Sequence, residues 1–299
     1  MSKQQPSEVN PQSPIPNPQS VNTNPQSAIA NPQSASANPQ STIRNPKFVS
    51  ANPQSPIRNP KFVSANPQLQ GMLPTPDDKA AYVRTMFDRI APRYDTLNRL
   101  FSFQLDQAWR RQTIRAAEVT AQDVVVDLAC GTGDLSELAG QTGARVVGVD
   151  FAGKMLVGAR RRQIRALFVQ ADAGCVPLPD AFATVILSGF ALRNFVSIPA
   201  VLVEAARVLK SGGRVALLEV DTPANPVLRW GHQFYFNRVV PFVGALLSDR
   251  QAYAYLPRSV SYLPSPSDFR VMIEQAGFQQ VIRYQLSGGI AQLIVARRK

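Results

Sequence analysis

The residues best suited to chemistry follow a run of valines, in the segment VVVDLACGTGDLSELA. Asp127 ends the run, and Gly131, Thr132 and Gly133 come next, where a helical pattern begins. Glycines in such a turn permit positive φ and let the backbone approach a ligand closely. A dinucleotide site uses the same turn, but here Ser136 replaces the third glycine of that fingerprint. The turn therefore fits a nucleoside better than a pyrophosphate.

Further polar positions follow later strand patterns, each at a predicted strand end. Asp150 ends VVGVD, Asp172 and Ala173 end FVQADA, and Ser188 follows VIL in VILSGF. Because a carboxylate offers the paired acceptors that a cis-diol requires, Asp150 is the predicted partner of an adenosyl ribose. We expect Asp172 and the backbone of Ala173 beside the adenine, and Ser188 on the other side of the nucleoside. Each of these residues, taken singly, could instead be a strand-end cap.

A parallel sheet would bring these positions to one edge. From residue 78 onward, apolar strand patterns alternate with amphipathic helical ones, which is typical of a doubly wound α/β fold. Two helices broken near Ala91-Pro92 are expected in Ala80–Glu118, and a second helical insertion in Val227–Leu247; both would cap the carboxyl edge, where ligands bind. We expect a mostly parallel, seven-stranded, Rossmann-like sheet with a helical cap, built from Val124–Leu128, Arg145–Val149, Leu167–Gln170, Thr184–Leu187, Arg214–Glu219, Gln280–Tyr284 and Ala291–Ala296.

The composition narrows the chemistry. The chain has 299 residues, 44% of them hydrophobic, which is enough for a sizeable buried core. Cys130 and Cys175 are too few for a disulfide framework, and with His232 as the single histidine a catalytic triad and a histidine-rich metal site are excluded. We therefore expect a cytoplasmic setting, no metal, and carboxylates, Tyr or water as proton acceptors.

The formal net charge of +12 points to an acidic partner, either nucleic acid or an anionic membrane surface. No apolar stretch approaches the roughly 20 residues of a spanning helix, and no N-terminal signal pattern is present. Within Val227–Leu247, aromatic residues interleave with Arg229 and Arg238, which suits an interfacial helix, although packing of a lid is favoured slightly. Two basic clusters could equally be solvated helix faces: Arg110, Arg111 and Arg115, and Arg160, Arg161, Arg162 and Arg165.

Residues 1–71 form a separate segment, in which Asn-Pro recurs every seven residues from Asn10 to Asn66. A proline in every repeat excludes a coiled coil, and the Asn, Pro, Gln and Ser content predicts a disordered tail. The predicted domains are thus the tail, 1–71, and a folded domain, 72–299. The tail is either a spacer or a translated tandem repeat, and we favour the second, with Met72 as the physiological start.

Several long stretches carry a family resemblance, which covers about residues 78 to 299. The chain resembles the ubiquinone/menaquinone biosynthesis C-methyltransferase family, within the class I S-adenosylmethionine (SAM) dependent methyltransferases. It departs from that family at Ala129 and Gln104, where glycine is common, and at Asp106 and Gln292, near positions where the family has histidine. The matching stretches are MFDRIAPRYDTLNRLFSF with Trp109, DLACGTGD, ALRNFVSIPAVLVEAARVLKSGGRVALLEVDTP, and YLPRSVSYLPSPSDFRVMIEQAGFQQV with LSGGIA.

The resemblance implies methyl transfer from SAM to a ring carbon of a demethylated isoprenoid quinol, such as demethylmenaquinol, or alternatively a polyprenyl benzoquinol. The ring carbon becomes nucleophilic when a ring hydroxyl loses its proton, and fixed donors would stabilise the developing phenolate. Arg193 and Asn194 of ALRN are the predicted donors, with a structural ion pair as the alternative for Arg193. Tyr94 is the predicted proton relay, with Asp95 and Asn98 beside it, although capping and packing explain Tyr94 and Asp95 about as well.

Other functions stay open at this point. A nucleic-acid methyltransferase would carry consecutive prolines and an aromatic residue after the fourth strand, or a Pro-Cys nucleophile, whereas this chain has ALRN there. Ser136 disfavours an NAD-dependent oxidoreductase. Because of the departures at Gln104 and Asp106, a catalytically inactive scaffold protein in a quinone-biosynthesis complex stays open as an alternative. We expect a quinol as substrate and no nucleic-acid partner, and peripheral membrane contact and a homo-oligomer are left open.

Overall fold

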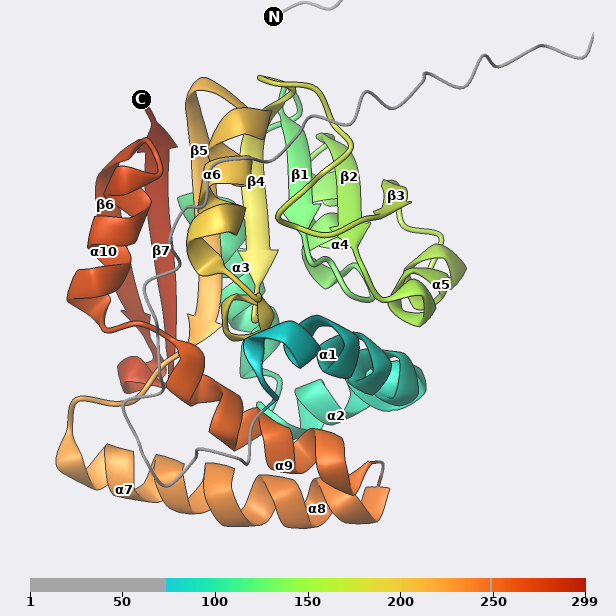
Figure 1. Ribbon diagram of the computed structural model, residues 1–299, viewed down its shortest axis with the longest axis vertical. Helices are drawn as coiled ribbons and strands as arrows, with labels where there is room; N and C mark the ends of the chain where they lie inside the picture. The colour runs from blue at the N-terminus through green and yellow to red at the C-terminus, as the bar shows by residue number, and fades with distance from the viewer. Residues whose placement is uncertain (1–73, 248) are drawn as a thin grey trace, which may run out of the picture. The chain divides into compact units, whose positions relative to one another are not determined.

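The computed structural model describes residues 74–247 and 249–299 (Figure 1). The predicted disordered repeat and the predicted domain boundary at Met72 lie outside these residues. The described residues form one seven-stranded sheet in the order β3-β2-β1-β4-β5-β7-β6. Strands β1 to β5 run parallel, and β7 is antiparallel to both of its neighbours. The predicted doubly wound, mostly parallel sheet is confirmed.

All seven predicted strands are present, several of them longer than expected. The fifth begins well before the predicted Arg214, so the Gly212-Gly213 turn lies inside the strand. Gly212 has a φ of +74°, and the register with the neighbouring strand shifts between Ala183 and Val185, which marks a bulge. The strands are β1 Val124–Leu128, β2 Arg145–Asp150, β3 Leu167–Gln170, β4 Ala183–Gly189, β5 Leu209–Val220, β6 Phe278–Leu286 and β7 Ala291–Arg298.

Helices cover both faces of the sheet, so every residue of β1 is buried. Alternate residues of β1 point to opposite faces: Val125 packs with Leu135 in one apolar cluster, and Val126 with Leu202 in another. The helices of the first cluster are α3 Leu105–Ala116 and α4 Asp134–Gln141; those of the second are α6 Ile198–Val208 and α10 Pro266–Gln275. The helix α5 Gly153–Arg161 contacts β2 and β3.

The N-terminal cap has more breaks than predicted. The expected break at Ala91–Arg93 is a short 3-10 turn between α1 Pro76–Ile90 and α2 Tyr94–Phe101. A second break separates α2 from α3, because Phe103 and Gln104 have φ values of +52° and +61°. The expectation of two helices in this segment was therefore wrong. Neither Gly nor Pro stands at this second break, so the sequence carries no local signal for it.

The second insertion is helical, as predicted, and it continues through a π-helical turn. It comprises α7 Pro226–Phe234, the π turn η4 Tyr235–Val239 and α8 Val240–Leu247. The next helix, α9 Arg250–Ser259, was not predicted, and its Tyr253 packs so closely on Gly244 that no larger residue fits there. Figure 1 places α1, α2 and α7 to α9 below the carboxyl ends of the parallel strands. Across the described ranges, no helix has both the length and the hydropathy to cross a bilayer.

Candidate active site

The loop between β1 and α4 is shaped by three residues with positive φ: Ala129 at +54°, Gly131 at +58° and Gly133 at +89°. At Gly133 a Cβ would lie 2.7 Å from Ile164 Cδ1, the movable end of that side chain, so the backbone conformation favours glycine more than the available space does. Ala129 bears its methyl group in the left-handed region, which normally costs about 1–2 kcal/mol. A glycine at this position would avoid this strain.

Asp127 lies beneath this loop rather than in a cavity wall. It is 1% exposed, and Ser136 Oγ donates to its Oδ2 at 2.7 Å. Ser136, which breaks the dinucleotide fingerprint, therefore joins β1 to α4. In the part of the chain that the structure describes, Oδ1 of Asp127 has no hydrogen-bond partner. Burial raises the pKa of Asp127 to about 7.

Asp150 lies at the end of β2 and faces a cavity. The backbone N–H of Gly131 donates to one carboxylate oxygen and that of Ala152 to the other, both at 2.8 Å. Each oxygen keeps a further lone pair, so the carboxylate can still accept from two hydroxyls. Burial raises the pKa of Asp150 to about 6, which leaves the group mostly ionised at neutral pH.

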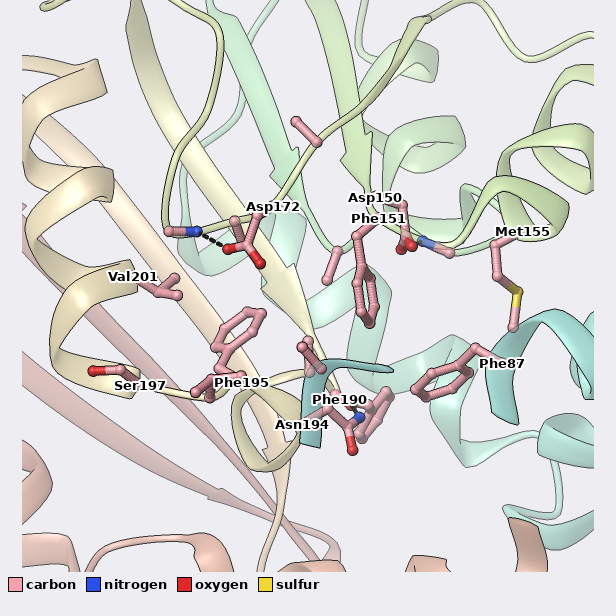
Figure 2. A pocket seen from close by; sticks show the side chains of 18 of the residues that line it. Phe87, Asp150, Phe151, Met155, Asp172, Phe190, Asn194, Phe195, Ser197 and Val201 are labelled. Atoms are coloured by element: carbon pink, nitrogen blue, oxygen red, sulfur yellow. Dashed lines mark hydrogen bonds between the residues drawn. The ribbon is translucent and has the colours of Figure 1, made fainter. Parts of the chain in front are cut away.

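The cavity at these strand ends, here the strand-end cavity, has a volume of ≈ 320 Å³. Of the predicted cofactor residues, Gly131, Asp150, Asp172 and Ala173 line it, and so do the predicted catalytic Tyr94 and Asn194. Figure 2 shows the two carboxylates with the rings of Phe151 and Phe195 between them and the cap. The Asp172 side chain accepts from the N–H of Gly174 at 2.7 Å, which forms a tight turn after β3.

Four of the predicted cofactor residues do not line this cavity. Asp127 lies beneath the loop, and Gly133 is the loop residue that faces Ile164. The Ser188 hydroxyl, 2% exposed, donates to the Leu128 carbonyl at 2.9 Å. Ser188 therefore clamps β4 to β1, as the strand-end alternative predicted. The Thr132 hydroxyl donates to Asp95. This hydrogen bond joins the β1–α4 loop, here called the cofactor loop, to α2 of the cap.

A second cavity, here the cap cavity, adjoins the first and has a volume of ≈ 420 Å³. Phe87, Tyr94 and Phe190 line both cavities, so a ligand in either cavity would contact these rings. Most of its other walls are apolar side chains from the cap, among them Phe101, Leu105, Trp109, Val227, Leu228, Tyr235, Phe236, Val240 and Leu256. Burial raises the pKa of Tyr94, which keeps the phenol protonated.

The ALRN segment forms a short 3-10 turn, Leu192–Asn194, between the two cavities. Arg193 lines the cap cavity and makes a buried ion pair with Glu219, whose side chain is fully buried at the end of β5. Tyr255 donates to the Asn194 amide oxygen at 3.3 Å, and the Asn194 amide donates to the Phe190 carbonyl at 3.4 Å. The partner Glu219 was missed by sequence reasoning, which had only the generic alternative of an ion pair.

The two predicted basic clusters are partly structural. Arg110, which is buried, pairs with Asp106 and Asp134, and Arg162 pairs with Asp134 and Glu137. These pairs join α3, α4 and α5 beneath the cofactor loop. The interpretation of both clusters as solvated faces or acidic-partner sites is therefore wrong for these two arginines.

Two residues that the sequence left without a role also line the cap cavity. Asp106 is buried and accepts from Ser102 at 2.7 Å, and His232 stacks on Phe236 with ring centroids 5.4 Å apart. Burial lowers the pKa of His232, so its imidazole is neutral at neutral pH. The aromatic neighbours of His232 were visible in the sequence, but its position against a cavity was not. Within residues 74–247 and 249–299, no cluster of His, Cys, Asp or Glu could hold a metal.

Comparison with known proteins decides the family. The model of the ubiE/COQ5 methyltransferase family matches residues 75–298. The chain belongs to this family. It is 42% identical to a demethylmenaquinone methyltransferase of Thermus thermophilus, over 71% of this chain and 100% of the relative.

A second relative supports this family, and a solved structure shows the same fold. The ubiquinone/menaquinone biosynthesis C-methyltransferase of Syntrophotalea carbinolica is 41% identical, over 70% of this chain and 91% of the relative. A SAM-dependent methyltransferase structure from Thermotoga maritima has the same fold, with a TM-score of 0.52 and 18% identity, and covers 73% of this chain and 100% of its own. As a member of the ubiE/COQ5 family, the chain is a methyltransferase, and family and fold together imply SAM as the methyl donor.

Proposed function

We propose that this ubiE/COQ5 family member methylates a ring carbon of a demethylated isoprenoid quinol, converting demethylmenaquinol to menaquinol. One observation carries the proposal: a cavity that presents the strand-end carboxylates Asp150 and Asp172 shares the walls Phe87, Tyr94 and Phe190 with a second, more apolar cavity. A charged nucleoside suits the first cavity, and an isoprenoid quinol suits the second. Relatives named as demethylmenaquinone methyltransferases support the naphthoquinol, and those named for ubiquinone as well keep a benzoquinol as the alternative.

The strand-end cavity fits SAM on its own chemistry. Asp150 would accept from both ribose hydroxyls, Gly131 allows the backbone to approach the ligand, and Asp172 and Ala173 would border the adenine. Asp127, Thr132, Gly133 and Ser188 would act from behind the wall by holding the loop and strands in place. When bound, SAM supplies an electrophilic methyl group on a positively charged sulfur.

The quinol substrate would bind in the cap cavity. The aromatic ring would lie at Tyr94 and Phe190, where the cavities adjoin, near Asn194 of the strand-end cavity. The prenyl chain would lie among the apolar side chains between α7 and the rest of the cap. Tyr94 stays protonated and would donate to a quinol oxygen, while the guanidinium of Arg193 would stabilise negative charge developing on the ring.

Proton balance requires an acceptor in the same cavity. The ring carbon gains a methyl group, the sulfonium becomes a thioether, and one proton leaves the quinol. Asp106 and the neutral imidazole of His232 both line the cap cavity and are the acceptors we propose, directly or through water. Tyr94, because burial keeps it protonated, is proposed as a donor rather than as the acceptor that the sequence indicated.

The remaining parts of the proposal concern the whole protein. Residues 72–299 would make up the methyltransferase domain, after a disordered tail at 1–71. We propose that the enzyme works in the cytoplasm at a membrane surface, where its apolar substrate resides, and that nucleic acid is not a partner. A homo-oligomer remains compatible with this proposal.

Transfer of labelled methyl groups tests the function. The full chain is incubated with methyl-labelled SAM and one of three acceptors: reduced demethylmenaquinone, a reduced demethylated polyprenyl benzoquinone, or total RNA. We expect label in the naphthoquinol, and much less of it at the same SAM concentration when Asp150 is replaced by Asn. Label in RNA, or SAM binding without label in either quinol, would contradict the proposal; the second result would indicate a scaffold.

A further inference from the structure

The outer side of α7, η4 and α8 is an exposed apolar stripe. Trp230, Phe242 and Leu246 are 73%, 74% and 78% exposed, and Phe234 stacks on Trp230 with ring centroids 6.1 Å apart. With Arg238 between them, these residues recur every four positions, and the π-helical turn keeps the stripe from drifting around the helix. Soluble monomers rarely leave such an apolar surface uncovered unless it binds something. Figure 1 shows α7 and α8 at the edge of the molecule, farthest from the sheet.

The charge on this segment is of one sign. From Thr222 to Leu247 the sequence contains Arg229, Arg238 and no Asp or Glu, and both arginines are exposed. A helix with apolar and aromatic residues flanked by arginines is complementary to an anionic lipid surface. Two copies of the chain meeting through this stripe would instead bring arginines together with no carboxylate from the helix between them.

The inner side of the same helix lines the cap cavity through Leu228, His232, Tyr235 and Phe236. At the α2–α3 turn, Phe103 is 72% exposed and packs on Tyr235 with ring centroids 5.6 Å apart. Phe103 also lines the cap cavity, so the exposed apolar surface continues to the rim of that cavity. One helix thus separates the outer stripe from the proposed quinol site.

We propose that the outer stripe of α7–α8, together with Phe103, docks on an anionic bilayer surface, and that the quinol passes from the lipid directly into the cap cavity. This inference rests on the proposed function for the identity of the substrate. Trp230, Phe234, Phe242 and Leu246 enter the interface between headgroups and acyl chains, and Arg238 lies at the headgroups. The strand-end cavity, with its carboxylates Asp150 and Asp172, stays on the aqueous side.

Vesicle flotation tests the docking surface. The full chain is mixed with vesicles of phosphatidylcholine alone or of equal parts phosphatidylcholine and phosphatidylglycerol, at low salt. We expect flotation with the anionic vesicles, and binding at least about tenfold weaker for the double variant Trp230→Ser with Phe242→Ser. Val203→Ser with Val271→Ser, which changes two exposed valines on α6 and α10, is the matched control and should bind as the parent does. Arg238→Gln should weaken binding about fivefold on anionic vesicles only.

Turnover measurements distinguish membrane docking from methyl transfer itself. Trp230→Ser with Phe242→Ser should lose turnover of a long-chain quinol embedded in vesicles and keep turnover of a short-chain, water-soluble quinol. Failure of the parent protein to bind anionic vesicles, or equal binding by the double variant, would overturn the docking proposal. A dimer in solution that the double variant dissociates would overturn it too, because a second copy would then cover the stripe. Failure of the parent protein on the short-chain quinol would instead count against the proposed function.

Discussion

The strand-end cavity and the cap cavity share three rings, yet different interactions hold them in shape. Backbone N–H groups and carboxylates define the first, as in the two hydrogen bonds from Gly131 and Ala152 to Asp150. Packed side chains define the second, which is lined by Trp109, Tyr235 and Phe236 among other apolar residues. The first is therefore expected to tolerate few polar changes, and the second to tolerate changes that preserve apolar volume.

The largest effect is expected where the two cavities meet, at Arg193. Replacing Arg193 with Ala leaves Glu219 buried and unpaired, so we expect a loss of about 3–5 kcal/mol in the free energy of unfolding, measured by denaturant titration. The paired replacement Arg193→Met with Glu219→Met should recover most of that stability and leave turnover absent. If Arg193→Ala kept full stability and lost only turnover, the ion pair would carry no structural role.

At Asp150 the expected effect is on cofactor affinity. Replacing Asp150 with Asn removes a charged acceptor for the ribose, which should weaken binding of S-adenosylhomocysteine by about 1.5–3 kcal/mol in calorimetry. The cap cavity should be unaffected, so affinity for a quinone analogue should stay the same. Equal weakening of both ligands would mean that Asp150 supports the fold rather than the nucleoside.

The raised pKa of Asp150 gives that affinity a pH dependence. Because burial raises the pKa to about 6, the free protein holds a proton on Asp150 below that pH, whereas the ribose hydroxyls require the carboxylate. Affinity for S-adenosylhomocysteine should be full above pH 6 and fall about tenfold per pH unit below it. The contribution of Asp150 to the free energy of unfolding changes with pH in the opposite direction. It is full at low pH, where the buried group is protonated, and is lost as the pH rises through 6. Asp150→Asn should abolish the decline in affinity.

The smallest effects compare one strained residue in each region. Ala129 in the cofactor loop and Gln104 in the cap both have left-handed φ values, +54° and +61°. Replacing either with Gly should raise the free energy of unfolding by up to about 1 kcal/mol. Gln112→Gly, inside α3 at an ordinary helical position, is the control and should lower it by about 1 kcal/mol. A loss of stability at Gln104→Gly would show that its side chain matters more than its backbone.

The sequence predicted the strand-end region closely and the cap much less well. Asp150 and Asp172 could be predicted from the sequence, because strand periodicity and parallel pairing place the residues at the strand ends along one edge of the sheet. Ser188 was assigned to the nucleoside, since a hydroxyl at a strand end looks the same in sequence whether it binds a ligand or a backbone carbonyl. The α2–α3 break, the helix α9 and the partner Glu219 depend on contacts between distant segments, which no local pattern records.

The most direct test of the two-cavity account is a crossed titration with two variants. Asp150→Asn changes the strand-end cavity, and Gly231→Phe adds a ring in the cap cavity, where a Cβ on Gly231 meets no neighbour within 4 Å. Calorimetry with S-adenosylhomocysteine and with a short-chain naphthoquinone analogue measures the affinity of each variant for each ligand. Asp150→Asn is predicted to lose only the nucleoside and Gly231→Phe only the quinone. Loss of both ligands in both variants, or retained quinone binding in Gly231→Phe, would contradict the account.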